Sequence, residues 1–254
     1  MLLAIDIGNT NVLFGIHHEG QWVAHWRIRT VRDKMPDEYA VLFKEFLRDQ
    51  GVQLTDIRQV ILSSVVPPLT GVFRELCHRY VSHPPLVLGP GVRTGLNIRT
   101  DNPAEVGADL IANGVAAYDR FRDNCIVVDF GTATTFSAVA KPGEFLGVAI
   151  APGLGLAADA LAGRTAQLPR VYLEAPPAAI GKNTVHSMQS GLVFGYVGLT
   201  EGLIRRLRGE LGGQARVIAT GGLAEIIAPL TEQIEVVEPW LTLEGLRLIA
   251  ERNP

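Results

Sequence analysis

The chain has 254 residues, of which 47% are hydrophobic and 19% are charged, and its formal net charge is −3. This length allows one large or two smaller folded domains, and the composition excludes an intrinsically disordered chain. The near balance of charge gives no basic surface for nucleic acid, and two cysteines are too few for a disulfide framework. No apolar stretch is long enough to span a bilayer, and the N-terminus lacks the basic segment of a signal peptide. We therefore expect a cytoplasmic protein with no nucleic-acid or membrane partner.

The first sixteen residues predict a β-hairpin with a polar tip. Apolar runs at residues 2–5 and 12–16 flank Asp6 and the turn Gly8-Asn9-Thr10-Asn11. The turn combines backbone N–H groups, a hydroxyl, two amides and a carboxylate, which suit phosphate oxygens and a hydrated cation. The hypothesis is a phosphate-binding hairpin, and the alternative is a polar hairpin tip without function.

The next hundred residues continue as alternating strands and helices. A third strand at 21–28 is expected to place Trp22 and Trp26 on one face and Val23 and His25 on the other. The periodicity then predicts a helix at 37–48, a strand at 57–63, a helix at 69–80 and a short strand at 84–88. The segment from Gly89 to Pro103 is rich in glycine and proline and is expected to be a long loop.

Asp109 opens the helix expected from there through Phe121. A carboxylate in the first turn is favoured by the helix dipole and could be only an end cap. The small neighbours Gly107 and Ala108 would also let a ligand come close to it. Both interpretations of Asp109 stay open on spacing alone.

A second copy of the acidic hairpin occupies residues 125–139. An apolar strand leads to Asp129, Gly131 and Thr132, and another strand follows. Because the same strand–acidic turn–strand unit occurs once in each half, we expect a duplicated α/β fold with both turns facing one cleft. We place the N-terminal half at residues 1–115 and the C-terminal half at 116–254.

The remaining pattern completes the second half. We expect a strand at 144–150, a helix opening at the A-P-G of 151–153, a long helix at 185–207, a strand at 215–219, a helix from Leu223, a short strand at 234–237 and a closing helix at 242–251. Thr220-Gly221-Gly222 is a place for nucleotide to approach the backbone, or an ordinary βα turn. A row of glycines in the long helix indicates close contact with another element, a ligand or a second subunit: Gly191, Gly195, Gly198 and Gly202.

Several motifs in this order resemble the type III pantothenate kinases. They are D-I-G-N-T-N at 6–11, S-S-V-V-P-P at 63–68, G-P-G-V-x-T-G-L at 89–96, D-N-P-x-E-V-G-A-D at 101–109, D-F-G-T-A-T-T-F at 129–136, A-P-G at 151–153, G-x-N-T at 181–184, A-T-G-G-L at 219–223 and L-T-L-E-G-L at 241–246. The resemblance implies the duplicated ribonuclease H-like fold of actin-like ATPases, with two mixed five-stranded sheets flanked by helices and a cleft between them. It also implies transfer of the γ-phosphoryl group of ATP to pantothenate, with Mg²⁺ and a monovalent cation, K⁺ or NH₄⁺, in a homodimer.

The resemblance also assigns residues to roles. Asp109 would be the general base, and Asp129 and Asp6 would hold the monovalent and divalent cations. The substrate pantothenate would lie against Gly107, Ala108, Asp109, Leu110 and Thr184. The ATP phosphates would contact Asp6, Ile7, Gly8, Asn9, Thr10, Asn11, Val12, Leu13 and Thr132.

Four positions depart from the family's usual pattern: Thr100 replaces Tyr, Leu110 replaces Arg, Ser137 replaces Asp and Val148 replaces Gly. An Arg at 110 could pair with the pantothenate carboxylate, and losing such a bond costs about 1.5–3 kcal/mol. Two hypotheses therefore remain beside an ordinary pantothenate kinase. One is a nucleotide-binding homologue with an accessory or regulatory role, and the other is a kinase for a different small alcohol.

Overall fold

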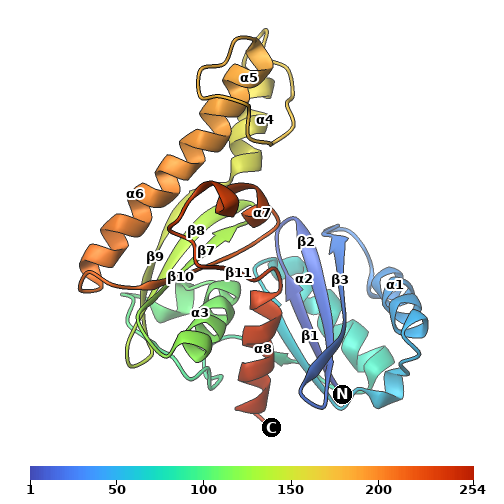
Figure 1. Cartoon of the computed structure of the whole chain (residues 1–254). Coiled ribbons are helices and arrows are strands. Elements are labelled where there is room, and N and C mark those ends of the chain that lie inside the picture. The colour runs from blue at the N-terminus through green and yellow to red at the C-terminus, as the bar shows by residue number, and fades with distance from the viewer. The chain divides into compact units, whose positions relative to one another are not determined.

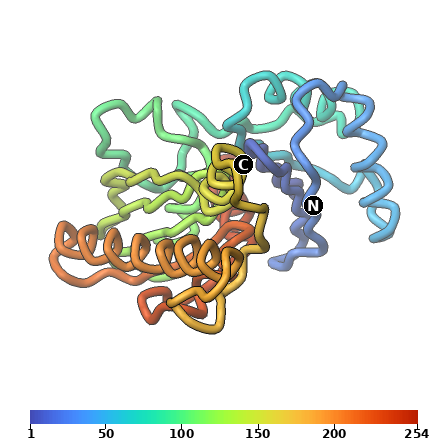
Figure 2. Tube along the Cα trace, turned by 90° about the horizontal axis from the view of Figure 1, so that it is seen from above, coloured from blue at the N-terminus to red at the C-terminus, as the bar shows by residue number.

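The computed structural model describes all 254 residues. The chain divides into two compact units. The first unit comprises Met1–Leu96, Asp101–Ala116 and Leu241–Pro254, and the second comprises Asn97–Thr100 and Ala117–Trp240. Both chain ends therefore belong to the first unit (Figure 2). The division at 115/116 stays a prediction, and the C-terminal segment after Trp240 is part of the first unit.

The first unit is a five-stranded mixed sheet with helices on both faces (Figure 1). The strand order is β3-β2-β1-β4-β5, in which β1, β2 and β3 are antiparallel and β4 and β5 run parallel to β1. Its elements are β1 (Leu2–Ile7), β2 (Asn11–His18), β3 (Gln21–Arg29), α1 (Pro36–Asp49), the 3₁₀ turn η1 (Leu54–Asp56), β4 (Gln59–Ser64), α2 (Pro67–Leu76), the π-helical turn η2 (Cys77–Val81), β5 (Leu86–Val87), the 3₁₀ turn η3 (Pro103–Glu105) and α8 (Leu241–Glu251). Helix α3 (Ala108–Phe121) begins in this unit and ends in the other.

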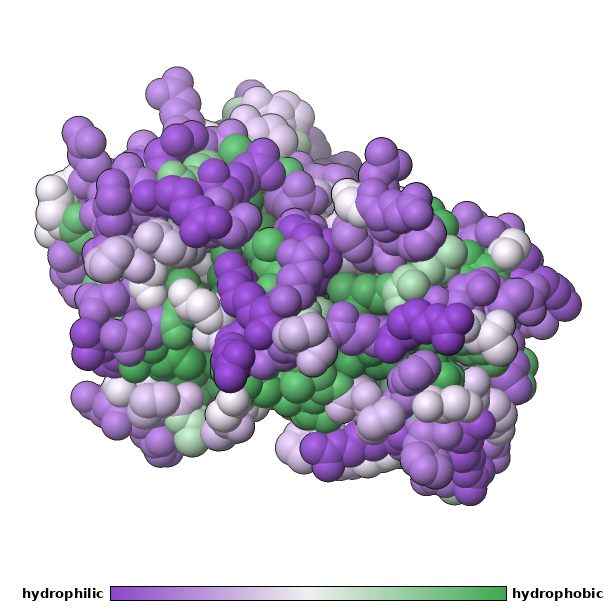
Figure 3. All heavy atoms as spheres, turned by 90° about the horizontal axis from the view of Figure 1, so that it is seen from below, coloured by the Kyte–Doolittle hydropathy of each residue, from purple (hydrophilic) through white to green (hydrophobic).

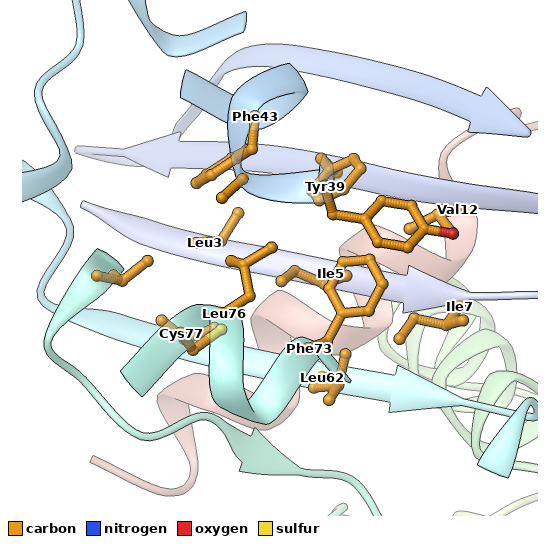
Figure 4. Packing of buried hydrophobic residues seen from close by; sticks show 14 of the residues in the cluster. Leu3, Ile5, Ile7, Val12, Tyr39, Phe43, Leu62, Phe73, Leu76 and Cys77 are labelled. Carbon is orange, nitrogen blue, oxygen red and sulfur yellow. The ribbon is translucent and has the colours of Figure 1, made fainter. Parts of the chain in front are cut away.

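Alternation along β1 separates the two faces of this sheet. Leu3, Ile5 and Ile7 join a core formed with α1 and α2 (Figure 4). In this core the aromatic rings of Phe14 and Phe43 stack at 5.4 Å. Asp6 and the residues two apart from it face the other way. That opposite face is covered by α8, because a side chain on Gly15 would meet Leu243. Burial of Leu3, Ile5 and Ile7 in the core sets the position of β1, and the position of β1 in turn places Asp6 on the opposite face of the sheet.

The second unit repeats this topology and adds one strand. Its order is β11-β10-β7-β8-β9-β6, with an antiparallel β7–β8–β9 meander beside parallel β10 and β11. Its elements are β6 (Asn97–Ile98), β7 (Cys125–Phe130), β8 (Ala133–Ala140), β9 (Glu144–Pro152), α4 (Leu154–Arg164), α5 (Thr184–Gln189), the π-helical turn η4 (Ser190–Phe194), α6 (Gly195–Glu210), β10 (Arg216–Thr220), α7 (Ala224–Ile227), the 3₁₀ turn η5 (Ala228–Leu230) and β11 (Val236–Val237). The predicted duplication of an α/β unit is confirmed.

Two local predictions are wrong. The expected loop 89–103 contains β6, which pairs with β9 and makes the second sheet six-stranded rather than five-stranded. The expected helix 185–207 is confirmed, since the chain is helical from Thr184 to Glu210 with a π-helical turn at Ser190–Phe194. Trp22 and Trp26 lie on opposite faces, because a β-bulge shifts the register between Ile16 and His17. Trp26 stacks on Phe46 at 5.5 Å, whereas the Trp22 indole donates to Glu244 of α8.

Two surface features bear on the expected partners. None of the helices combines the length and apolarity that a membrane crossing needs. The face drawn in Figure 3 is mostly hydrophilic, with smaller apolar areas between the polar side chains.

Candidate active site

The predicted ATP-binding residues 6–13 span the end of β1, the first turn and the start of β2. Asp6 and Ile7 belong to β1, Asn9 and Thr10 are exposed at the tip, and Asn11 begins β2. Ile7 and Val12 are fully buried, with side chains in the core. These two residues can therefore offer a ligand only their backbone, while the tip can offer side chains as well.

The carbonyl oxygens of the first turn already have donors within the chain. Thr30 Oγ1 donates to the Gly8 carbonyl at 2.7 Å, and the Thr30 amide donates to the Thr10 carbonyl at 2.9 Å. The Gly8 amide donates to the Asn11 carbonyl at 2.9 Å. Occupied acceptors lower the negative potential that an anion would meet, so this arrangement favours phosphate at the tip.

Asp6 lies beside a serine that the sequence analysis did not single out as a site residue. In the parallel pairing of β1 with β4, Asp6 is opposite Ser63, so both side chains project from the same face of the sheet. Asp6 is 8% exposed and Ser63 is fully buried. The Ser63 hydroxyl has no hydrogen-bond partner in the protein. A buried hydroxyl beside a carboxylate forms an oxygen donor set, which fits Mg²⁺.

The second turn joins β7 to β8. As in the first turn, an aspartate lies opposite a hydroxyl-bearing residue of a neighbouring strand. Asp129 is opposite Thr135 in the antiparallel pairing and opposite Thr220 in the parallel pairing with β10. The Thr135 hydroxyl is buried and has no hydrogen-bond partner in the protein. Thr132 is exposed at the tip. This second set of oxygen atoms also fits a hard cation.

Two glycines let other backbone segments approach the second turn. A β-carbon on Gly153 would lie 2.1 Å from the Thr132 carbonyl oxygen, and the Gly153 amide donates to that oxygen at 3.1 Å. Gly221 has a φ of +90°, and a β-carbon there would lie 2.5 Å from Asp129 Oδ1. The motifs A-P-G and T-G-G therefore shape the surroundings of Asp129. Only glycine leaves this space open.

Asp109 is the second residue of α3 and is partly buried. Its Oδ1 accepts a hydrogen bond from the Leu110 amide at 2.8 Å. Burial raises the pKa of the Asp109 carboxyl, although the hydrogen bond from Leu110 opposes the shift. A β-carbon on Gly107 would lie 2.6 Å from Oδ1, so a larger residue there would displace the carboxyl from this position. A carboxyl with a raised pKa in a small-residue setting suits a general base.

Thr184 is the first residue of α5, in the second unit. The preceding residue, Asn183, caps the helix by accepting from the His186 amide at 2.9 Å. Thr184 lines a cavity of about 770 Å³. The other residues lining it are Leu161, Leu168, Gly181, Lys182, Asn183, Ser187, Met188, Gly191 and Leu192. This cavity combines an apolar wall with one lysine and several polar groups, and its volume suits a small amphipathic ligand.

Each unit holds one group of the residues predicted to form the site. The first unit contains residues 6–13 and Gly107–Leu110, and the second contains Asp129, Thr132 and Thr184. No cluster of three or more His, Cys, Asp or Glu side chains that could hold a metal ion occurs in either unit. Ser63, Thr30 and Thr135 were missed as site residues. Alternation along their strands could have placed Thr135 beside the turn, but the partners of Ser63 and Thr30 depend on pairing across the sheet.

The fold is shared with ATPases and sugar-kinase-like proteins of known structure. A putative 2-dehydro-3-deoxygalactonokinase from Sinorhizobium meliloti matches with a TM-score of 0.61 and 13% identity, covering 100% of this chain and 97% of that one. MreB 5 of Spiroplasma citri, solved with AMPPNP, matches with a TM-score of 0.59 and 9% identity, covering 99% and 96%. The duplicated sheets and their two acidic turns thus define a protein of the actin-like ATPase fold.

The sequence comparisons narrow this class to one family. Residues 2–206 match the family described as type III pantothenate kinase. The type III pantothenate kinase of Moorella thermoacetica is 53% identical over 253 residues, and that of Citrifermentans bemidjiense is 51% identical over 253 residues, each covering 100% of both chains. The chain belongs to the type III pantothenate kinases. The family's kinase activity implies use of ATP and a divalent metal ion.

Proposed function

We propose that this protein transfers the γ-phosphoryl group of ATP to the primary hydroxyl of pantothenate, giving 4′-phosphopantothenate, the first step of coenzyme A biosynthesis. The observation that carries the proposal is the 53% identity with a type III pantothenate kinase along the whole chain. Nothing in the structure favours the accessory homologue or a kinase for a different alcohol.

Asp109 is the general base in this proposal. Its Oδ1 is held by the Leu110 amide, so Oδ2 takes the proton from the attacking hydroxyl. The raised pKa makes the carboxylate a stronger base than an exposed aspartate. Phosphoryl transfer otherwise depends on alignment and charge neutralisation rather than on covalent chemistry with the protein.

The first turn binds the ATP phosphates through residues 6–13. The carbonyl oxygens of Gly8, Thr10 and Asn11 are satisfied internally, which favours an anion at the tip. Asp6 with Ser63 would hold Mg²⁺, which neutralises phosphate charge when bound.

The second turn holds the monovalent cation. Asp129, with the Thr135 hydroxyl beside it, would bind K⁺ or NH₄⁺, and Thr132 at the exposed tip would contact a nucleotide phosphate. Gly221 supports this role because its missing side chain leaves room next to Asp129 Oδ1.

Pantothenate contacts Gly107, Ala108, Asp109 and Leu110, and also Thr184. The cavity supports the contact with Thr184, since its leucine and methionine side chains suit the branched carbon of pantothenate and Lys182 suits a carboxylate; residues 107–110 do not line it. Leu110 cannot form the charge-assisted bond of an arginine, so we expect a high KM for pantothenate.

The homodimer and the cytoplasmic location are also part of the proposal. A β-carbon on any of the four helix glycines, Gly191, Gly195, Gly198 and Gly202, would meet no atom within 4 Å. Contacts inside the chain therefore do not account for this glycine row, and a second subunit would.

The test is formation of phosphopantothenate from ATP, Mg²⁺ and pantothenate at concentrations up to tens of millimolar, compared for wild type and Asp109→Asn. We expect product from wild type, a loss of turnover of about 10²- to 10⁴-fold in the variant, and ATP binding nearly unchanged. No product from a wild-type protein that binds ATP would refute the proposal. Equal turnover in the variant would refute the role of Asp109.

A further inference from the structure

The segment that follows β3 lies against the first turn. Thr30 makes the two hydrogen bonds to the Gly8 and Thr10 carbonyls, and two residues later Arg32 reaches the same turn. Arg32 Nη2 donates to Asn9 Oδ1 at 3.2 Å. Residues 30–32 thus make three hydrogen bonds to the turn, and the one from Arg32 comes from a charged group.

The hairpin itself has no lysine or arginine side chain. The first 26 residues contain neither Lys nor Arg, while Asp6 contributes a negative charge at the base of the turn. A nucleoside triphosphate with one bound Mg²⁺ still carries about two negative charges, and kinases neutralise this charge with arginine or lysine as well as metal. Within the hairpin itself such a side chain is absent. Arg29 pairs with Asn11 across β2 and β3, at the end of the turn, and Arg32 is the arginine that the structure shows hydrogen-bonded to the tip.

The bonding of Arg32 leaves most of its donors available. A guanidinium group has five N–H donors, and the structure gives Arg32 one hydrogen bond, to Asn9, and no ion pair with a carboxylate. Arg48 and Arg79, in the same unit, instead form ion pairs with Glu45 and Asp37. The Asn9 amide therefore holds the guanidinium group in place, and its remaining N–H donors are available to another acceptor.

We propose that Arg32 binds the phosphate oxygens of ATP at the first turn, with Asn9 orienting its guanidinium group. This inference rests on the proposed function only in taking the first turn as the site of the ATP phosphates. Arginine can make two parallel hydrogen bonds to a phosphate group, which lysine cannot reproduce. The ligand recognised is the charged polyphosphate, so the contribution should grow with the number of phosphates.

The experiment compares Arg32→Ala and Arg32→Lys with Lys34→Ala as the matched control. Lys34 lies two residues away, and its ammonium group stands 5.4 Å from the centre of the Tyr39 ring, so its removal changes the net charge equally. Calorimetric titration with Mg²⁺-ATP and with AMP gives the affinities. Arg32 is exposed, so both Arg32 variants should retain the wild-type unfolding temperature.

We expect Arg32→Ala to weaken ATP binding by roughly 10- to 100-fold and AMP binding by less than about threefold. Arg32→Lys should recover part of the loss, and Lys34→Ala should bind ATP within about threefold of wild type. The KM for pantothenate should not change in any variant.

Equal losses for ATP and AMP in Arg32→Ala, or equal losses of ATP affinity in Arg32→Ala and Lys34→Ala, would overturn the inference. ATP binding is measured without acceptor, so the result is separate from the identity of the acceptor. A wild-type protein that binds ATP but forms no phosphopantothenate would refute the proposed function, and the Arg32 inference would still be decided by its own titration.

Discussion

The two acidic turns have the same strand topology but are held in place differently. The first is fixed by hydrogen bonds from residues 30–32 to the turn carbonyls and to Asn9. The second is fixed by close backbone approach at Gly153 and Gly221, where a β-carbon would lie 2.1 Å and 2.5 Å from atoms of the turn. The two halves of a duplicated fold can therefore share one strand topology while different interactions hold the equivalent turns. The first turn should be sensitive to lost donors, and the second to added volume.

The largest expected difference between the turns is in turnover. Asp6→Asn should lower turnover with saturating ATP by roughly 10²-fold or more, because it removes the carboxylate proposed to hold Mg²⁺. Raising the Mg²⁺ concentration should restore part of the rate. Steady-state assays across a Mg²⁺ series measure both effects. A variant with wild-type turnover and an unchanged Mg²⁺ dependence would remove Asp6 from the metal site.

The next largest difference should be in how much stability each turn loses when a glycine beside it is replaced by a larger residue. Gly153→Ala should lower the free energy of unfolding by about 3 kcal/mol, because the new methyl group collides with the Thr132 carbonyl and backbone atoms cannot move aside cheaply. Gly8→Ala is the matched control, since its β-carbon would lie 3.1 Å from the Asn11 carbonyl. Urea unfolding of both variants is the measurement. Equal losses in the two would contradict the difference between the turns.

A lost donor should affect the first turn to a smaller extent. Thr30→Val removes the hydrogen bond to the Gly8 carbonyl at nearly constant volume, and we expect a loss of about 1 kcal/mol in unfolding free energy. ATP affinity should fall as well, since the exposed carbonyl would face the phosphates. Titration with ATP measures this loss. Unchanged stability and affinity would show that the segment does not support the turn.

The smallest expected effect on stability concerns Asp109, which lies outside both turns. Its pKa is raised in the folded state, so its stabilising contribution is present at low pH and is lost as pH rises through the folded pKa. Asp109→Asn should therefore unfold at a higher temperature than wild type at pH 8, with the difference vanishing in acid. Thermal unfolding at several pH values tests this. A lower unfolding temperature for the variant at pH 8 would contradict the burial of an ionised carboxyl.

Local patterns predicted the framework of both units and the two turns. The alternating runs around Asp6 and Asp129 and the amphipathic helix at 37–48 correspond to β1, β2, β7, β8 and α1. Strand β6 was missed because two residues are too few to show a period. The faces of Trp22 and Trp26 were wrong because a bulge reverses the alternation.

The supports of the site depend on contacts between distant residues. Ser63 comes beside Asp6 only through the pairing of β4 with β1, and Gly153 is separated from Thr132 by the whole of β8 and β9. No local periodicity reports such contacts. The sequence therefore indicates the two turns as candidate sites, but it does not show which distant residues hold them in place.

The most direct test of the different tasks of the two turns is a K⁺ titration of phosphopantothenate formation by wild type and Asp129→Ala at fixed Mg²⁺-ATP. We expect a rate that rises with K⁺ in wild type and does not respond to K⁺ in the variant, while the Mg²⁺ dependence stays the same. Activation by K⁺ that persists in Asp129→Ala with wild-type midpoint would contradict it and place the cation site away from the second turn.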